Sequence, residues 1–308
     1  AEYPAAKLIV GNTEVAIEMR LKAFEYNIFV NPSHVQELRV LESNETGIVV
    51  GAAVTINGLR TFCGKLDEDM AKAGKAYLTR GLRAIKHMLT WFASNHIRNV
   101  ACVGGNIATA SPISDLNPML LACNAVLTIH SASKGSRQLP IKEFFLAYRK
   151  VALEADEILV SVFIPFTSQF EYVLPYKQAR RREDDVSIVT AGMRVRLAPK
   201  ADAAGWVVED AVLSFGGMAP TAVQANARGL DGAAPHTLAA AGDRSQQLTR
   251  VLRDALHRVL HRLQYGQVLL ATVGSTAPFV GLLGTVWGIY HALTGIGLDG
   301  PFRIEQVY

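Results

Sequence analysis

Two short glycine-containing segments of the sequence have the residue types of a phosphate site. LIVGNTEV covers residues 8–15, and CVGGNIATAS covers residues 102–111. Glycine lets an anion approach the main chain closely, and consecutive N–H groups at a strand end can donate to phosphate oxygens. Neither segment has the GxGxxG or the Walker spacing, so each taken singly is more often an ordinary tight turn. Two such segments, both rich in small hydroxyl residues, favour a shared phosphate site.

Other candidate chemistry is sparse. The three cysteines, Cys63, Cys102 and Cys123, show no CxxC spacing, which argues against a disulfide framework, a zinc site and an iron–sulfur cluster. His257 and His261 stand one helical turn apart, but no third ligand is evident. We therefore expect no metal site and place these two histidines on the polar face of a helix.

Composition bounds the class of protein. The chain has 308 residues, of which 50% are hydrophobic and 19% charged, so it is globular and long enough for two domains. The net charge of +4 is small, which argues against nucleic acid as a partner. The sequence starts without the pattern of a secretory signal, and we expect residues 1–226 to lie in the cytoplasm.

The elements that would hold these segments are mixed in type. A helix is predicted from Thr79 to Asn95, because Leu82, Ile85, Met88, Leu89 and Phe92 recur at helical spacing. Strands are predicted at residues 7–10, 27–32, 47–56, 157–165, 187–199 and 207–217, with a strand and loop at 100–118 and a hairpin at 125–141 that turns at 134–136. This order indicates an α+β fold.

The last quarter of the chain differs from the rest. Residues 227–243 are predicted to be a linker rich in Ala, Gly and Pro, and residues 245–265 an amphipathic helix with a basic face. From Gln267 to Leu298 there is no Asp, Glu, Lys or Arg, which is longer than the ~20 residues needed to cross a bilayer. We predict a transmembrane helix at 267–297, with a buried core helix as the alternative, and expect association with the inner membrane.

Five motifs carry a resemblance to a known family: KLIVGNTEVAIEM, RNVACVGGNIATASPISDLNP, FFLAYRK, KQARRREDDVSIVTAGMRV and LSFGGMAPT. Between about residues 7 and 225, the chain resembles the FAD domain of eukaryotic-type xanthine dehydrogenase. The resemblance implies a vanillyl-alcohol-oxidase-type FAD-binding domain at 1–170. It also implies an incomplete carbon monoxide dehydrogenase flavoprotein C-terminal-like domain at 171–226. Cys102 and Arg180 stand where this family usually has serine.

The same resemblance assigns residues to FAD and to NAD, its electron acceptor. Phe92 would stack on a ring, Asp115 would accept a hydrogen bond from a ribose or a ring N–H, and Lys177 would offset negative charge. Judged from the sequence without this resemblance, Phe92 is more simply a core residue and Lys177 an ordinary surface lysine. Glu14 and Asp184 are the expected catalytic positions, with Tyr148 and Asp184 on the nicotinamide side. The expected cofactor-binding residues are Leu8, Ile9, Val10, Gly11, Asn12, Thr13, Glu14, Val15, Phe92, Cys102, Val103, Gly104, Gly105, Asn106, Thr109, Asp115, Leu159 and Lys177.

The tail at 230–308, with its segment STAPFVGLLGTVWGI, resembles the ExbB/TolQ/MotA proton-channel family. That likeness implies partners of the ExbD and TonB kind and a pore-lining Thr285, whose alternative role is a hydrogen bond to its own helix backbone. Three functions follow as alternatives. The first is the FAD-binding electron-transfer segment of an enzyme whose iron–sulfur and molybdenum domains are its partners. The second is a component of a proton-driven membrane complex, and the third is a non-functional composite of two fragments.

Overall fold

The computed structural model describes residues 6–199 and 206–228. The chain divides into two compact units, residues 1–233 and residues 234–308, and every described residue belongs to the first. The two predicted tail helices and Thr285 lie outside the described residues. Among the residues that are described, no helix is long and apolar enough to span a bilayer.

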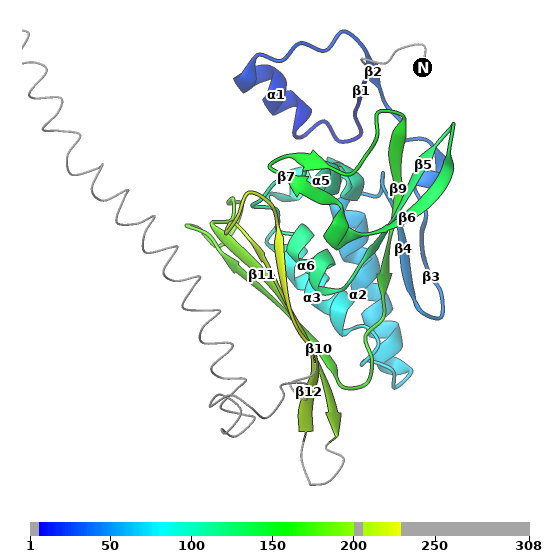
Figure 1. Cartoon of the computed structure of the whole chain (residues 1–308), viewed down its shortest axis with the longest axis vertical. Helices are drawn as coiled ribbons and strands as arrows, with labels where there is room; N and C mark the ends of the chain where they lie inside the picture. Colours follow the sequence, from blue (N-terminus) through cyan, green and yellow to red (C-terminus); the bar gives the residue numbers. More distant parts are fainter. Residues whose placement is uncertain (1–5, 200–205, 229–308) are drawn as a thin grey trace, which may run out of the picture. The chain divides into compact units, whose positions relative to one another are not determined.

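The N-terminal segment forms a small βαβ unit (Figure 1). Strand β1 (Lys7–Leu8) pairs in parallel with β2 (Phe29–Val30), and helix α1 (Val15–Lys22) connects them. The strands predicted at 7–10 and 27–32 are confirmed but are only two residues long. Helix α1 was not predicted, and none of its residues is buried, so its sequence lacks the apolar stripe that would have revealed it.

The first large sheet is antiparallel and has the strand order β3-β4-β9-β5-β6. Its strands are β3 (Leu41–Ser43), β4 (Gly47–Gly51), β5 (Val126–Ser131), β6 (Gly135–Pro140) and β9 (Glu157–Pro165). The hairpin predicted at 125–141 and the strand predicted at 157–165 are confirmed. The strand predicted at 47–56 is too long, because Thr55 caps a new helix by accepting from Gly58 N at 3.0 Å.

Helices fill the space between this sheet and a second one (Figure 1). They are α2 (Ile56–Lys72), α3 (Arg80–Thr90), α4 (Asn95–Val100), α5 (Val103–Thr109) and α6 (Asn117–Ala122). Leu82, Ile85, Met88 and Leu89 are buried as predicted, but α3 ends at Thr90, so Phe92 lies beyond it. The predicted strand near Cys102 is wrong, since Cys102 makes one isolated bridge with Thr55 and α5 follows at once.

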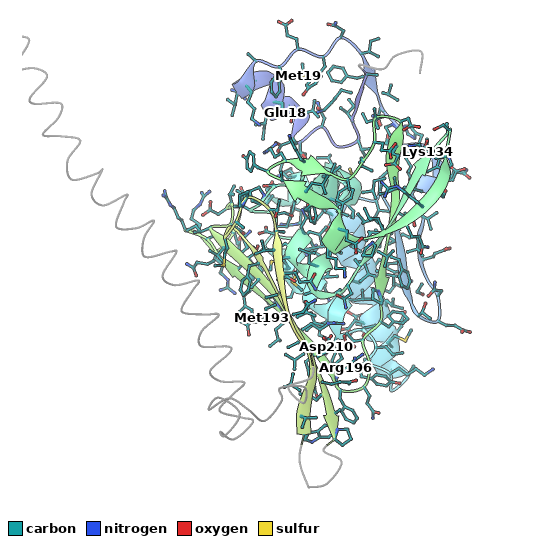
Figure 2. The ribbon with its side chains drawn as sticks, viewed as in Figure 1. Glu18, Met19, Lys134, Met193, Arg196 and Asp210 are labelled. Atoms are coloured by element: carbon teal, nitrogen blue, oxygen red, sulfur yellow. The ribbon has the colours of Figure 1, made fainter. Side chains whose placement is uncertain are left out.

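The second sheet is antiparallel and has the order β10-β11-β12-β13. Its strands are β10 (Glu171–Gln178), β11 (Val189–Pro199), β12 (Trp206–Gly216) and β13 (Val223–Arg228), of which β11 and β12 match predicted strands. Helix α3 packs against β10, and α6 packs against β11 and β12. On the β11–β12 pair, Arg196 Nε lies 3.0 Å from Glu209 Oε2, and Figure 2 marks Arg196 and Met193 on β11.

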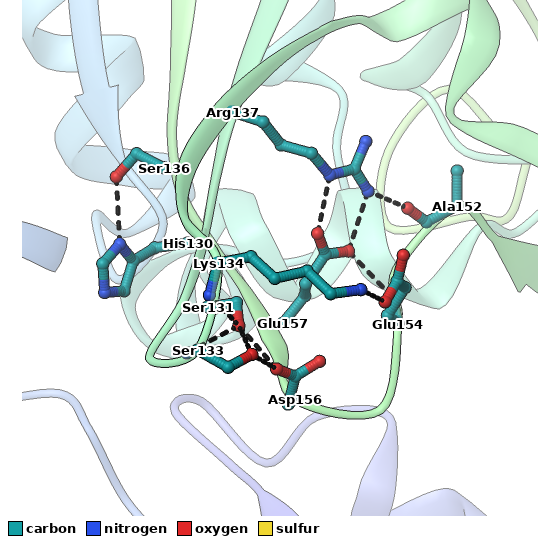
Figure 3. Close-up of polar contacts among 10 residues, drawn as sticks. All are labelled: His130, Ser131, Ser133, Lys134, Ser136, Arg137, Ala152, Glu154, Asp156 and Glu157. Carbon is teal, nitrogen blue, oxygen red and sulfur yellow. Dashed lines mark hydrogen bonds and ion pairs between the residues drawn. The ribbon is translucent and has the colours of Figure 1, made fainter.

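An ionic cluster fixes the loop that leads into β9 (Figure 3). Arg137 on β6 donates Nε and Nη2 to the two carboxylate oxygens of Glu157 at 2.6 and 2.7 Å, and Nη2 also donates to Ala152 O at 2.7 Å. The Arg137 guanidinium holds the pKa of Glu157 at about 2. A short hairpin, β7 (Phe145–Ala147) and β8 (Lys150–Val151), precedes this loop and projects toward the N-terminal unit (Figure 1).

Candidate functional site

The two glycine-containing segments line one groove. Its volume is about 780 Å³, within the range of small-molecule and cofactor sites. One side of its wall is made by residues 7–15 of the N-terminal unit, and another by residues at the start and on one face of α5. The wall also includes Phe92, Ala93, Arg149 and parts of the segments at 111–115 and 181–187. Segments about ninety residues apart in the chain therefore face a common space.

The first segment offers unpaired main-chain donors. Ile9 N donates to Val30 O and Ala16 N donates to Asn12 O, while the N–H groups of residues 12–15 have no main-chain acceptor among the described residues. Residue 15 is the first of helix α1, so these groups also carry the positive end of the helix dipole. This side of the groove is suited to an anion.

Gly11 fits only because it has no side chain. A Cβ at this position would lie 2.0 Å from Val100 O, 2.6 Å from Val100 C and 2.9 Å from Ala101 N. The first segment therefore rests directly on the main chain that leads into α5. Asn12, the next residue, adopts the left-handed conformation with a φ of 55°.

The second segment differs from its prediction. Gly104 and Gly105 lie in the first turn of α5, and the N–H groups of residues 103–106 all donate within the protein, to Val54 O, Ala52 O, Cys102 Sγ and Cys102 O. Gly104 is glycine because a Cβ would meet Ala52 Cβ at 2.5 Å. The segment thus gives the groove a surface of Gly105, Asn106 and Thr109, and does not give it a row of free main-chain donors.

Cys102 joins the two segments. Its Sγ accepts from Gly105 N at 3.2 Å as the N-cap of α5, and the N–H group of Gly11 acts on the same thiol by lowering its pKa. Burial raises the pKa of the Cys102 thiol, and these N–H donors only partly offset the increase. The thiol is therefore a neutral structural link between the segments.

Arg98 shapes the end of the groove near Phe92. Its Nη1 donates to Phe92 O and Ala93 O at 2.6 Å each and to Thr90 O at 3.3 Å. These contacts hold Ala93 at a φ of 40°, a conformation that is unfavourable for alanine. Phe92, half-buried, is thereby fixed on the wall of the groove.

A buried ion pair lies behind the same wall. Lys177 Nζ donates to Asp115 Oδ2 at 2.8 Å, to Trp91 O at 2.7 Å and to Asp185 O at 3.0 Å. Ser187 Oγ donates to the other oxygen of Asp115. Burial raises the pKa of Asp115, while Lys177 and Ser187 act in the opposite direction. Asp115 lines the groove, but Lys177 is fully engaged behind it.

In the charged loop at 180–185, Asp184, Asp185 and Arg181 line the groove, whereas Arg180 and Arg182 do not. Asp184 has a φ of 51°. Arg182 turns away and stacks on the Trp91 ring at 4.6 Å from its centroid, beside a second cavity of about 500 Å³ that Arg180 and Arg181 also line. The acidic end of the loop therefore faces the groove.

Glu14 is paired with a residue that the sequence did not single out. Arg149, at the tip of the β7–β8 hairpin with a φ of 55°, places Nη1 2.5 Å from Glu14 Oε1. Neighbouring Tyr148 is 59% exposed and is not part of the groove wall. The motif FFLAYRK contained the signal for Arg149, because it puts a cation next to a tyrosine assigned to the site.

The structure brings most of the predicted residues together. Those that line the groove are Leu8, Ile9, Val10, Gly11, Asn12, Thr13, Glu14, Val15, Phe92, Cys102, Gly105, Asn106, Thr109, Asp115 and Asp184. Val103, Gly104 and Leu159 are buried and are not part of the wall, and Lys177 contacts the wall through Asp115. In the part of the chain that the structure describes, no group of His, Cys, Asp or Glu side chains could hold a metal ion.

The sequence is similar to known FAD-binding proteins. The family described as FAD binding domain in molybdopterin dehydrogenase matches residues 1–167. Xanthine dehydrogenase 1 of Arabidopsis thaliana is 48% identical over 220 residues, which are 71% of this chain and 16% of the relative. Xanthine dehydrogenase/oxidase of Gallus gallus is 45% identical over 226 residues, 73% of this chain and 16% of the relative. The chain thus spans about a sixth of the length of these relatives.

Solved structures share the fold. Carbon monoxide dehydrogenase from Hydrogenophaga pseudoflava matches with a TM-score of 0.60 at 21% identity, over 71% of this chain and 69% of the matched chain. Quinoline 2-oxidoreductase from Pseudomonas putida 86 matches with a TM-score of 0.60 at 22% identity, over 72% and 70%. The MotA/TolQ/ExbB proton channel family matches residues 223–307, of which the structure describes 223–228.

Proposed function

Because the chain belongs to the family of FAD binding domains of molybdopterin dehydrogenases, we propose that the groove binds FAD, with the diphosphate between residues 11–15 and 102–106. The observation that carries this proposal is the convergence of these two segments on one groove of about 780 Å³. A groove of this size, with free N–H groups on one wall and glycine on the other, accommodates a long ligand with an anionic centre.

The residues of the groove fit the parts of the cofactor. The unpaired N–H groups of residues 12–15 would donate to phosphate oxygens, and exposed Gly105 leaves room opposite them. Phe92, held by Arg98, offers a flat ring for stacking. Asp115 would accept a hydrogen bond while Lys177 compensates its charge. Leu159, Val103 and Gly104 would support the flavin and diphosphate positions from behind the wall.

When bound, FAD supplies the capacity to pass a hydride to a second cofactor, which we take to be NAD. The protein then has to align two rings and exclude water. Glu14, fixed by Arg149, and Asp184, fixed by its left-handed backbone, are the residues we assign to the nicotinamide side. Tyr148, exposed at the tip of the β7–β8 hairpin, would cover this second ligand from outside the groove.

The activity of a longer assembly is part of the same proposal. The chain spans 16% of xanthine dehydrogenase 1, so a source of electrons would come from iron–sulfur and molybdenum domains outside it. We propose that the flavin domain receives electrons from such partners in the cytoplasm and delivers them to NAD.

Spectroscopy of the purified full chain tests the proposal. We expect added FAD to be retained through gel filtration with flavin absorbance near one equivalent, and anaerobic NADH to bleach that absorbance. Arg182→Gln is the matched control, since Arg182 lines the neighbouring cavity and stacks on Trp91 outside the groove. A well-folded chain that retains no FAD would overturn the assignment, and retention without NADH bleaching would overturn the NAD step alone.

The match of residues 223–307 to the proton-channel family supports a second candidate, a membrane energy-transduction segment with partners of the ExbD and TonB kind. On this candidate Thr285 would line a pore, and the chain would associate with the inner membrane. Flotation of the full chain with liposomes, compared with a chain ending at residue 233, tests it. Equal recovery of both chains in the soluble fraction would exclude the membrane candidate.

A further inference from the structure

The groove has an excess of negative charge. Its wall carries three cationic side chains and five carboxylates: Lys7, Arg149 and Arg181, against Glu14, Glu18, Asp115, Asp184 and Asp185. A diphosphate adds further negative charge, and in a partly buried groove like charges repel more strongly than in water. A cation close to the ligand would add to the unpaired N–H groups of residues 12–15 and reduce this repulsion.

Two of the three cations are poorly suited to that role. Lys7 Nζ lies 3.1 Å from Glu18 Oε2 and over the Tyr26 ring at 4.8 Å, so its charge is already compensated. The Arg181 side chain is 73% exposed, where solvent screens its charge. Lys177, the nearest buried cation, is outside the wall and donates to three protein acceptors.

Arg149 differs from both. Its side chain is only 29% exposed, and its left-handed backbone at the tip of a tight hairpin fixes where it starts. Nη1 is bonded to Glu14 and lies 4.0 Å from Glu18 Oε1, so it too is paired, but Nε is buried and has no hydrogen-bond partner in the part of the chain that is described. Guanidinium nitrogens seldom stay buried without an acceptor, so Arg149 has hydrogen-bonding capacity that the described part of the protein does not use.

The position of Arg149 indicates which ligand could use this capacity. Its partner Glu14 is the N-cap residue of α1 and belongs to the run of N–H groups at residues 12–15 that have no main-chain acceptor. The guanidinium and these N–H groups therefore converge on the same part of the groove. A guanidinium fork matches phosphate oxygens and binds them in pairs, which a lone ammonium group does not.

We propose that Arg149 binds the diphosphate of a dinucleotide in the groove and supplies the positive charge that the two glycine-containing segments lack. The inference rests on the proposed function, since it takes a dinucleotide as the ligand. Two diphosphates have this chemistry, that of the flavin cofactor and that of the nicotinamide acceptor. Arg149 is a binding residue on either reading, and its pairing with Glu14 orients it.

The test compares Arg149→Gln, Arg149→Lys and the control Lys150→Gln, a neighbouring cation outside the groove wall. Loss of a charge-assisted contact should weaken binding about 10- to 100-fold. If the flavin diphosphate is the ligand, the Kd of FAD rises by this factor in Arg149→Gln while that of riboflavin, which has no diphosphate, is unchanged. If the acceptor's diphosphate is the ligand, FAD binding is unchanged and the KM for NADH rises instead.

Arg149→Lys keeps the charge and should recover part of the affinity that Arg149→Gln loses. The Kd of the affected dinucleotide should also depend less steeply on salt in Arg149→Gln than in the wild type. These readouts separate binding from a structural role, which would weaken riboflavin equally and leave the salt dependence unchanged. Wild-type FAD and NADH parameters retained in Arg149→Gln, or equal losses for FAD and riboflavin, would overturn the proposal. Failure of the wild type to bind FAD would instead overturn the proposed function.

Discussion

Substitution of Gly11 by alanine is the sharpest perturbation that the structure offers. The added Cβ would lie 2.0 Å from Val100 O, 2.6 Å from Val100 C and 2.9 Å from Ala101 N. A carbon and a carbonyl oxygen normally stay roughly 3.3 Å apart or more, so the segment must retreat by about 1 Å. All three neighbouring atoms are main chain, and no side chain can rotate to make room.

The retreat has two measurable consequences. Overpacking of this kind costs about 1–3 kcal/mol in the free energy of unfolding. It also moves the N–H groups of residues 12–15 away from the diphosphate. Loss of even one charge-assisted hydrogen bond, worth about 1.5–3 kcal/mol, raises the Kd of FAD by roughly tenfold or more, and loss of two raises it about 100-fold or more. Binding should therefore suffer more than folding.

The assay is an equilibrium titration of the apo-chain with FAD, followed by quenching of flavin fluorescence, beside urea unfolding of each variant. Gly64→Ala is the matched control, because a Cβ there meets only the flexible Lys86 side chain, at 3.0 Å, and Gly64 lies inside helix α2. We expect the control to bind FAD normally. A Gly11→Ala chain with wild-type affinity and stability would refute the close contact between the segments, and with it the position of the diphosphate.

Three further outcomes follow from the contacts described. Cys102→Ser should keep the helix cap, and its Kd for FAD should stay within a few-fold of the wild-type value. Cys102→Val should lose the cap and bind FAD more weakly, as measured by the same titration. Lys177→Met should lower the free energy of unfolding by about 3–5 kcal/mol in urea because Asp115 stays buried without its partner, and the additional change Asp115→Asn should restore part of it. Glu157 has a pKa lowered to about 2 by Arg137, so its contribution is complete above its unfolded pKa of about 4.3 and is lost as the pH falls toward 2. Thermal melts from pH 2 to 6 should show that loss in the wild type and a weaker pH dependence in Arg137→Gln.

Local pattern was sufficient to predict the elements with strong periodicity. Strand β9 was predicted at its observed bounds, and the buried face of α3 followed from its helical spacing. Helix α2 was missed because its start is continuous with a strand-like run of Val, Ala and Thr, and only the cap at Thr55 separates the two. Propensity alone cannot locate that boundary, since one side-chain hydrogen bond decides it.

The site shows a different limit. The meeting of the two glycine-containing segments was predictable from their composition together with the family likeness. Which of the two offers free main-chain N–H groups was not predictable. Both were expected to present main-chain donors, yet the donors of residues 103–106 are taken up within α5 and by the main chain at Ala52 and Val54. Whether an N–H group is free depends on its partners in space, and the sequence names only its neighbours in the chain.

Charge follows the same logic. Lys177 looked like the cation for the ligand, because it stands in a family motif, but three protein acceptors surround it. Arg149, which was passed over, is held in the groove with a buried nitrogen that lacks an acceptor. A cation can bind a ligand only through N–H groups that the protein itself does not use. The contacts in the folded structure determine how many such groups remain. The residue that the fold leaves incomplete is therefore a better candidate for the ligand than the one that the motif highlights.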